Sequence, residues 1–521
     1  MAWLHAWAGW PAGWVLYAVF ISGTLSYFRP EISHWMRPEL ATAREHPDSV
    51  ALAMRILQER APNSSRWVIN LPNAREPTLR VGWMAASEPG KADRLIGRFD
   101  GVVLDPSTGK ELQPRQTRGG DFFQRFHYEL GLGQVWGRWL VGGCAMAMLI
   151  AILSGVIAHK QLFRNFFTFR LGKGQRSWLD AHHAVGVLAL PYHLLITYTG
   201  LITMMFMYMP AAVETAYRYD PGGFLIEAFP NPPHAQSTGR SARLTAIEPL
   251  LQQAERQWNG AAPASIVIEY PGDAGARVQM QRSTPGKLTN TGQYIIFDGV
   301  SGGMLSVWGE ESGAMQVHGV LYGLHMARFS SFSLRWMFAL CGVLGTVMVA
   351  TGLVLWSVKR MPQRAEGQRA TLGQRVVEIL NNGTITGLPI AVAVYFWANR
   401  LLPVTLAERP AWEIRCFFAA WGLTYIAALL QNARTAWPRH FFVGALLFVL
   451  LPLVNGLTTS AHLGISLMQG PAIYAGFDLS MLGIAALLAI AAWNTSRVRP
   501  ERKETAGDTL PAGTPMLEER S

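Results

Sequence analysis

Long apolar runs alternate with polar regions along the first 360 residues, and more apolar runs follow almost to the end of the chain. Each run is about 20 residues long, which is the length of helix that crosses the hydrocarbon core of a bilayer. The pattern predicts an α-helical integral membrane protein with about eight transmembrane helices. The first four predicted spans are residues 1–28, 126–159, 179–209 and 326–358, and four more lie within 376–503, near 385–403, 414–432, 441–460 and 471–493.

Two polar regions, residues 29–125 and 210–325, separate the first span from the second and the third from the fourth. Each combines one stretch of helical periodicity with short runs that are typical of strands. We therefore expect two small α+β domains. The predicted helices are Ser49–Ala61 and Leu244–Trp258, and the predicted strands are Trp67–Leu71, Thr78–Met84, Gly101–Leu104, Ile266–Tyr270, Arg277–Gln281 and Tyr294–Phe297.

The 521-residue chain carries a formal net charge of +11, and its basic residues gather just outside the apolar runs. That distribution is the positive-inside signature of a cytoplasmic membrane face, so it indicates the lipid bilayer as partner and no nucleic acid. A strongly basic loop, residues 160–178, joins the second and third spans. With eight spans, this loop and both termini are expected in the cytoplasm and both polar domains in the periplasm. We expect the tail, residues 504–521, to be disordered.

The three cysteines, Cys144, Cys341 and Cys416, all lie inside apolar runs, and the sequence contains no CxxC or CxxCH. A disulfide framework, a thiolate metal site and covalently attached c-type haem are therefore not supported. The sequence also lacks a GxGxxG motif after a strand, so it does not indicate a flavin or nicotinamide site. Any haem would be b-type, held by side chains alone.

The first four spans form two copies of one unit, each built as span, α+β domain, span. A histidine and a glycine recur in the first span of each unit, and an arginine and a glycine recur in the second. The matched intervals are His5 to Gly23 and His182 to Gly200, both 18 residues, and Arg138 to Gly155 and Arg335 to Gly352, both 17 residues. Duplicated membrane units of this kind commonly place a functional site at their shared interface.

The duplication also places histidines in equivalent pairs. His5 and His182 both stand at the cytoplasmic start of an outward-going helix, and His127 and His325 both stand just outside the periplasmic start of an inward-going helix. A low-spin b-type haem takes two imidazoles, one on each face. We therefore predict two b-type haems, with the iron of one held by His5 and His182 and the iron of the other held by His127 and His325.

Two further histidines are weaker candidates. His193 lies 11 residues beyond His182 and has no counterpart in the first span. It could be a ligand, a hydrogen-bonding group between the haems or a satisfied core histidine. His159, at the cytoplasmic end of the second span, could be a ligand or an interfacial residue. His183 follows His182 directly, and a helix turns by about 100° per residue, so only one of these two should face the bundle axis.

Two arginines, Arg138 and Arg335, break the positive-inside pattern because both stand on the outer side at matching repeat positions. One interpretation is that they extend to the interface as long cationic side chains commonly do. The other is that they bind the haem propionates, because guanidinium binds carboxylate well. The sequence leaves both interpretations open.

A straight second span would carry His127 far from the other predicted ligands. Residues 127 and 159 are 32 residues apart, which corresponds to about 48 Å of continuous helix. Haems so far apart would exchange electrons slowly. Gly131, Gly133 and Gly137 favour a bend, which would fold His127 back toward the membrane surface.

Several short motifs in residues 1–360 are similar to those of the PepSY-associated transmembrane proteins. This is a family of bacterial inner-membrane proteins linked to iron uptake that includes ferric-siderophore reductases. The motifs are His5-Ala-Trp-Ala-Gly9, Phe126-His-Tyr-Glu-Leu130, Ser154-Gly155, Ser177-Trp-Leu-Asp-Ala-His182, Leu190-Pro-Tyr-His193, Thr199-Gly200, Leu324-His325 and Ala350-Thr-Gly-Leu-Val-Leu-Trp356. The resemblance implies that the polar regions are PepSY-like modules, that the cofactors are b-type haems, and that electrons pass across the inner membrane to ferric chelates in the periplasm.

The leading hypothesis is therefore a haem-containing reductase that passes electrons outward to a ferric siderophore and releases Fe(II). The electron donor would be a quinol or a cytoplasmic flavoprotein, and further uptake proteins of the periplasm or membrane are expected partners. Exposed basic side chains on the polar domains could attract an anionic chelate. These side chains are Arg75, Arg80, Arg115, Arg118, Arg277 and Arg282.

Two alternatives remain open on the sequence alone. PepSY-type modules could bind peptides or proteins, and the spans would then only anchor a non-enzymatic sensor or an accessory subunit of an uptake complex. A transporter built on the repeat is the third hypothesis. Haem absorbance of the purified protein separates the first hypothesis from the other two.

Overall fold

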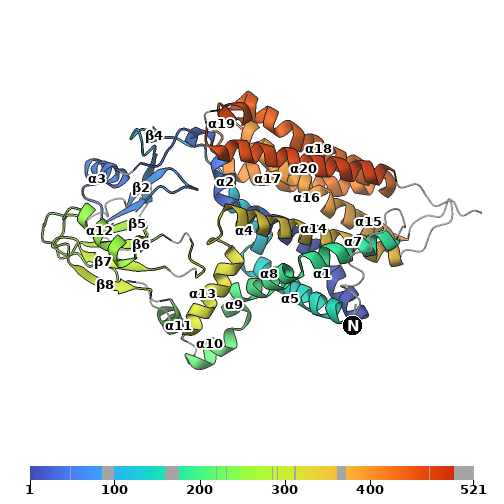
Figure 1. Cartoon of the computed structure of the whole chain (residues 1–521), viewed down its shortest axis with the longest axis horizontal. Helices are drawn as coiled ribbons and strands as arrows, with labels where there is room; N and C mark the ends of the chain where they lie inside the picture. Colours follow the sequence, from blue (N-terminus) through green and yellow to red (C-terminus); the bar gives the residue numbers. More distant parts are fainter. Residues whose placement is uncertain are drawn as a thin grey trace, which may run out of the picture.

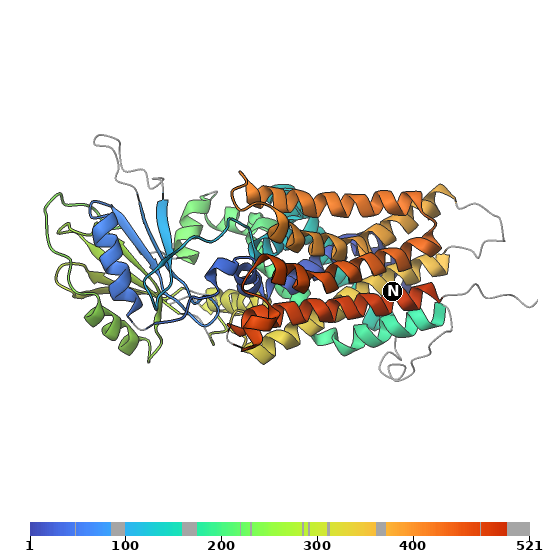
Figure 2. The same ribbon diagram turned by 90° about the horizontal axis from the view of Figure 1, so that it is seen from above.

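The structure, a computed structural model, describes residues 1–46, 48–84, 99–158, 175–218, 220–229, 232–283, 286–289, 292–309, 313–360, 371–468 and 470–497. Among the predicted features, His159, residues 160–174 of the basic loop and the tail 504–521 lie outside these residues. A bundle of long helices and a β-sheet lie next to each other along the longest axis of the molecule (Figure 1 and Figure 2). We call the end of the bundle that faces the sheet the sheet end, and the opposite end the far end.

Within the described residues, six helices are long and apolar enough to cross a membrane, or seven if a bent pair counts as one span. The sequence predicted eight. The remaining predicted span, α1 (Ala2–Ser26), has 25 residues and packs against α5 and α14, but it is not among these candidates. The six are α5 (Gln134–Ala158), α14 (Phe332–Arg360), α15 with α16 (Leu372–Leu401), α17 (Arg409–Leu430), α18 (Ala433–Thr458) and α20 (Ala472–Ser496).

The third predicted span is not one straight helix. It consists of α7 (Gln175–Leu188) and α8 (Leu190–Thr203), which meet at an angle of 68°. The bend has a local cause, because Pro191 lies at the start of α8 and cannot donate a backbone hydrogen bond to the preceding turn. Three short helices lead on toward the sheet: α9 (Met205–Tyr208), α10 (Pro210–Ala216) and α11 (Pro221–Ala228).

The predicted bend before α5 is present. Helix α4 (Gly120–Glu129) ends at Leu130, and the chain then reverses through Gly131 and Gly133, which all have positive φ. The second unit repeats this device: α13 (Gly313–Met326) ends before Ala327, whose φ is 48°, and α14 follows. Both short helices therefore lie between the bundle and the sheet (Figure 1).

The two polar regions were predicted to be separate domains, and in this respect the prediction was wrong. Their strands form one eight-stranded antiparallel sheet in the order β4-β3-β2-β1-β5-β6-β7-β8. The first region supplies β1 (Arg66–Asn70), β2 (Leu79–Met84), β3 (Phe99–Leu104) and β4 (Glu111–Leu112). The second supplies β5 (Pro263–Glu269), β6 (Arg277–Arg282), β7 (Tyr294–Asp298) and β8 (Met304–Trp308).

The two halves join along β1 and β5, where Trp67 is paired with Ile268 and Ile69 with Ile266. Alternate residues of a strand face the same side, so these four apolar side chains share one face. Helices α3 (Ser49–Arg60) and α12 (Glu248–Gln257) contribute to the same hydrophobic core. A single core therefore replaces the two that were expected.

The C-terminal unit consists of α15 (Leu372–Ile385), α16 (Gly387–Leu401), α17, α18, α19 (Leu463–Met468) and α20. Helix α15 starts well before the predicted run at 385–403, because Thr371 and Gln374 form a capping box at its N-terminus. The core of this unit is continuous with buried side chains of α1, α4 and α2 (Arg29–Trp35). The unit is thus packed onto the first repeat.

Candidate functional site: two histidine pairs

The four histidines predicted as ligands come together in two pairs. The ring centroids of His5 and His182 lie 6.2 Å apart at the far end of the bundle. Those of His127 and His325 lie 6.0 Å apart at the sheet end. Each pair takes one histidine from each repeat, so neither pair is complete without both units.

Every one of these histidines lies against a glycine of a neighbouring helix in its own unit. A side chain at any of these glycines would collide with the imidazole, since an added Cβ would lie between 2.7 and 3.2 Å from the ring. The contacts are His5 with Gly155, His127 with Gly23, His182 with Gly352 and His325 with Gly200. The glycines that marked the repeat in the sequence are therefore the surfaces on which the histidines rest.

Each histidine also hydrogen-bonds through Nδ1 to the backbone carbonyl four residues before its glycine. Because a carbonyl can only accept, Nδ1 carries the proton and Nε2 carries the lone pair. The bonds run from His5 to Ala151 (2.7 Å), from His127 to Val19 (2.8 Å), from His182 to Met348 (2.9 Å) and from His325 to Ile196 (3.1 Å). This is the arrangement that fixes the tautomer of a metal-binding histidine.

A hydroxyl residue precedes each glycine and completes the motif. Its side chain donates to the carbonyls three and four residues back, one of which is the acceptor of the histidine. The four are Ser22, Ser154, Thr199 and Thr351. The hydroxyl makes its hydrogen bond within its own helix, so no polar group is left without a partner at membrane depth.

The donor set fits a cofactor that needs only two protein ligands. No cluster of three or more histidine, cysteine or acidic side chains suited to an ion occurs in the described part of the chain. Imidazole nitrogens bind a transition metal at about 2 Å, which places two such nitrogens about 4 Å apart and their ring centres farther still. The observed centroid distances near 6 Å agree with that spacing.

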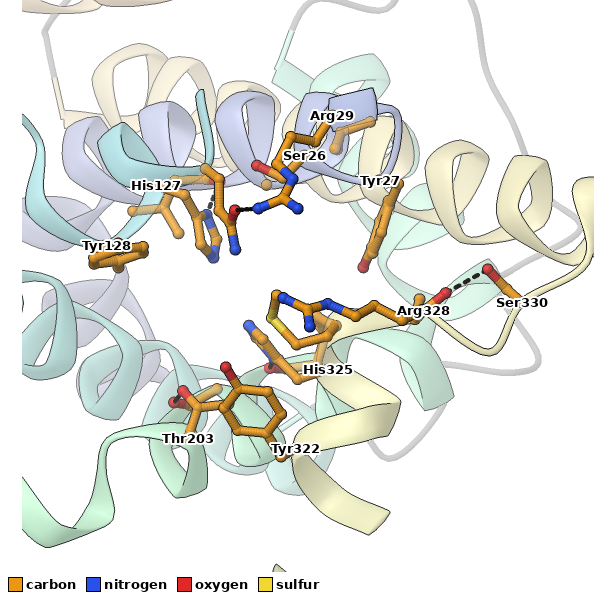
Figure 3. A pocket seen from close by; sticks show the side chains of 18 of the residues that line it. Ser26, Tyr27, Arg29, His127, Tyr128, Thr203, Tyr322, His325, Arg328 and Ser330 are labelled. Atoms are coloured by element: carbon orange, nitrogen blue, oxygen red, sulfur yellow. Dashed lines mark hydrogen bonds between the residues drawn. The ribbon is translucent and has the colours of Figure 1, made fainter. Parts of the chain in front are cut away.

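A cavity of about 1080 Å³ opens between the histidines of the sheet-end pair. Figure 3 shows His127 and His325 facing each other across it, with Arg29 and Arg328 reaching in from two sides. Apolar side chains of the bundle, such as Phe20, also line the cavity. The cavity can therefore hold a large, flat, mostly apolar group whose charged edge points toward the sheet.

Arg138 and Arg335 both line this cavity, as their matching repeat positions suggested. Each forms an ion pair, Arg138 with Glu129 at 2.9 Å and Arg335 with Glu31 at 2.7 Å. In both arginines Nε is buried and has no hydrogen-bond partner among the described residues. Each guanidinium is thus held in place, and because it has more donors than its ion pair uses, others remain for an anionic group.

Other predicted residues take different places. His193 is fully buried in α8, and neither ring nitrogen makes a hydrogen bond of normal geometry to a described residue, although the Cys341 backbone lies near. Its ring contacts Phe20 and Tyr192. It therefore belongs to neither pair. His183, which follows His182 in the sequence, also lies outside the pairs, because the ring that contacts His5 is that of His182.

Two of the six arginines that were predicted to be exposed on the polar domains are engaged in ion pairs. Arg75 binds Glu31 through two hydrogen bonds, and Arg115, which is only 8% exposed, binds Glu39. Neither is a free surface charge. Sequence reasoning also missed Arg29, Arg328 and the roles of the glycines. The repeated intervals marked the glycines, but nothing in the sequence showed that a ring would rest on them.

The fold and the site define a multi-pass helical membrane protein with two pairs of histidines at the interface of a duplicated unit. The family model described as the PepSY-associated TM region matches residues 2–359, so the chain belongs to that family, as the sequence motifs predicted. The chain is also 27% identical to a protein of Pseudomonas aeruginosa described as uncharacterized, over 408 residues that cover 74% of this chain and 98% of that protein. The C-terminal unit lies outside the family match.

Proposed function

We propose that this protein is a membrane reductase that holds two b-type haems and passes electrons across the bacterial inner membrane to a ferric siderophore. The observation that carries the proposal is the fourfold arrangement of histidine, glycine and backbone carbonyl. A single histidine on a glycine is a common packing contact. Four of them at matching repeat positions, joined into two pairs, are hard to explain by packing alone.

The chain's own residues would hold the cofactors in stated roles. His5 and His182 would bind one haem iron, and His127 and His325 would bind the other, in each case through Nε2. Arg138 and Arg335 would bind the propionates at the sheet end through their remaining donors. Bound haem would supply reversible one-electron transfer, which no side chain of this site provides.

The spacing of the two pairs suits transfer across a membrane. His5 and Gly23 are 18 residues apart on α1, which corresponds to about 27 Å of helix rise. The two sites would therefore lie near opposite faces of a hydrocarbon core about 30 Å thick. In the predicted orientation the far end faces the cytoplasm, where a quinol or a flavoprotein would donate electrons, and the sheet faces the periplasm.

A ferric siderophore suits the sheet side of this haem as electron acceptor, because the haem itself would occupy the space between His127 and His325. Arginines dominate the charged lining of the cavity, so its opening favours an anionic chelate. Hard oxygen ligands hold Fe(II) far less tightly than Fe(III), so the transfer of one electron to the chelate releases the metal. No bond of the siderophore has to break.

The test is the haem content of the purified full-length protein. We expect a pyridine haemochrome assay to give two b-type haems per chain and no covalent haem. Alanine at His5 or His182 should remove the far-end haem only, and alanine at His127 or His325 the sheet-end haem only. His46→Ala and His462→Ala serve as controls and should retain both. Protein without any haem absorbance would contradict the proposal and favour a non-enzymatic sensor or accessory subunit.

A further inference from the structure

The C-terminal unit packs on the part of the first repeat that carries a predicted ligand. Helix α4 bears His127, and the segment just before it, residues 113–119, runs along α16 and α17. Both helices belong to the C-terminal unit, which lies beyond the family match.

The segment before α4 is held by buried polar groups of the C-terminal unit. Four hydrogen bonds join it to the unit. Two of them use backbone carbonyls of the segment, one uses a backbone carbonyl of the unit, and one joins two side chains. The bonds run from Arg115 to the Asn399 carbonyl (2.9 Å), from Arg409 to the Gln116 carbonyl (3.0 Å), from Thr117 to the Glu413 carboxylate (2.5 Å) and from Tyr395 to the Gly119 carbonyl (3.1 Å). The segment is thereby fixed at four of its residues, Arg115, Gln116, Thr117 and Gly119.

Helix α4 itself is enclosed by aromatic rings of the same unit. Three phenylalanines on α4 face it, and His127 directly follows the last of them. Phe122 lies 4.8 Å from Tyr395 between ring centroids, Phe123 lies 5.7 Å from Phe396 and Phe126 lies 5.4 Å from Phe417. The turn after α4 continues the contact, because a Cβ at Gly131 would lie 2.9 Å from the ring of Phe418.

The centre of this contact is an ion pair whose presence is not explained by stability. Arg409 and Glu413 are both fully buried, and Asn399 also donates to Glu413 at 2.8 Å. Replacing a buried ion pair by apolar side chains is often neutral or stabilising, so such pairs add specificity more readily than stability. Here the carboxylate accepts the Thr117 hydroxyl and so selects one position for the chain before α4.

The second repeat lacks this enclosure at the matching place. Helix α13, which bears His325, packs against α8 of its own unit. Counted back from the histidine, Val320, Leu321 and Leu324 match Phe122, Phe123 and Phe126. The three residues of α13 are half-buried, whereas the three phenylalanines of α4 are at most 7% exposed. The two ligand-bearing helices are therefore held by different means.

We infer that the C-terminal unit is a clamp that positions His127 opposite His325, with Thr117 and Glu413 as its central positioning residues. The inference rests on the proposed function in one respect only, namely that the clamp sets the geometry of the sheet-end haem. The clamp itself is a statement about α4 and can be tested without haem.

The experiment compares Thr117→Val with Thr384→Val in the full-length protein. Both changes remove a buried hydroxyl bonded to the C-terminal unit, but Thr384 bonds Tyr425 inside that unit, away from α4. In Thr117→Val we expect amide hydrogen exchange of residues 120–129 to accelerate by about tenfold, because the hydroxyl loses its bond to the Glu413 carboxylate and the bond it accepts from the Gly119 amide. Glu413→Gln, which leaves the Gly119 bond in place, should accelerate the exchange of the same residues. Thr117→Ser should restore protection, and Thr384→Val should leave it unchanged.

The second readout is the electron paramagnetic resonance signal of the low-spin haems. Thr117→Val should shift the signal of the sheet-end haem, leave that of the far-end haem unchanged, and be rescued by Thr117→Ser. Equal exchange of residues 120–129 in Thr117→Val and the unchanged protein would overturn the clamp. Wild-type protein without haem would overturn the proposed function alone, because the exchange measurement still decides whether α4 is clamped.

Discussion

The two repeats share the contacts of a histidine with a glycine and a backbone carbonyl, but they differ in the helices that support these contacts. Both place a histidine on a glycine and bond it to the carbonyl four residues back. The first repeat has one continuous helix, α1, and a clamped α4, whereas the second has a helix bent by 68° and a more exposed α13. The contacts that hold the histidines have been kept at both positions while the support has diverged.

This contrast means that the two histidines within each pair are supported differently. Each pair draws one histidine from a firmly packed unit and one from a unit with a bent helix. His193 sharpens the difference, since it is buried in the second repeat where the first has Leu16. The two sides of each pair therefore have different surroundings, and under the proposed function burial and neighbouring contacts would tune the haem potentials.

The largest expected effect comes from filling the glycine surfaces. Gly23→Val or Gly200→Val should remove the sheet-end haem, and Gly155→Val or Gly352→Val the far-end haem, because the added side chain would overlap the imidazole. The measurement is the haem-to-protein ratio with optical spectra. Gly143→Val is the matched control, since no atom lies within 4 Å of a Cβ there. If the glycines of one repeat tolerate valine, the motif is not equivalent in the two units.

The next effect concerns how the sheet is attached. Glu31 accepts hydrogen bonds from Arg75 of the loop between β1 and β2 and from Arg335 of α14. In Glu31→Gln this bridge loses its charge, and we expect amide exchange of residues 72–77 to rise on the order of tenfold. Glu129→Gln, which breaks an ion pair within the bundle, should leave that loop protected. Equal effects of both variants would show that Glu31 does not attach the sheet.

A smaller effect, on stability, is expected when His193 and Leu16, which occupy matching positions, are made more alike. His193→Leu removes a buried imidazole that makes no hydrogen bond of normal geometry to a described residue, so we expect a gain in stability of about 1–3 kcal/mol. Leu16→His should cost a similar amount. Thermal unfolding in detergent measures both. A loss of stability in His193→Leu would mean that His193 has a partner in the native protein, such as a cofactor or a water molecule.

The smallest effect is a pH dependence at the contact between α2 and the C-terminal unit. Burial, together with the positive charges of Arg37 and Arg80, lowers the pKa of His34 from 6.5 to about 4. The unfolded chain therefore binds a proton more readily, so stability is fully present above about pH 6.5 and declines as the pH falls toward 4. The thermal midpoint should fall by a few degrees between pH 7 and pH 5, and His34→Gln should reduce that fall.

The sequence revealed the pairing of the histidines because a duplication turns local spacing into information about symmetry. His5 and His182 share a position in the repeat, so a two-fold arrangement brings them together. The bend that returns His127 to the bundle was predicted for the same reason that it forms, since Gly131 and Gly133 adopt positive φ at little cost.

Other features could not be read from the sequence because they depend on distant contacts. The pairing of β1 with β5 joins residues 66–70 to residues 265–269, and each half looked complete as a small sheet. The ion pairs of Arg75 and Arg115 depend on how the sheet meets the bundle. The clamp on α4 joins Thr117 to Glu413, and neither residue forms a motif on its own.

The shared sheet has a consequence for how the chain is made. Strand β1 leaves the ribosome nearly 200 residues before β5, so the first half of the sheet must wait with an open edge that carries Trp67 and Ile69. Unpaired edges of this kind are prone to pair with other chains. Synthesis of the second polar region ends that exposure, so a pause in synthesis between the two regions should favour aggregation, and a chaperone that covers strand edges should favour assembly.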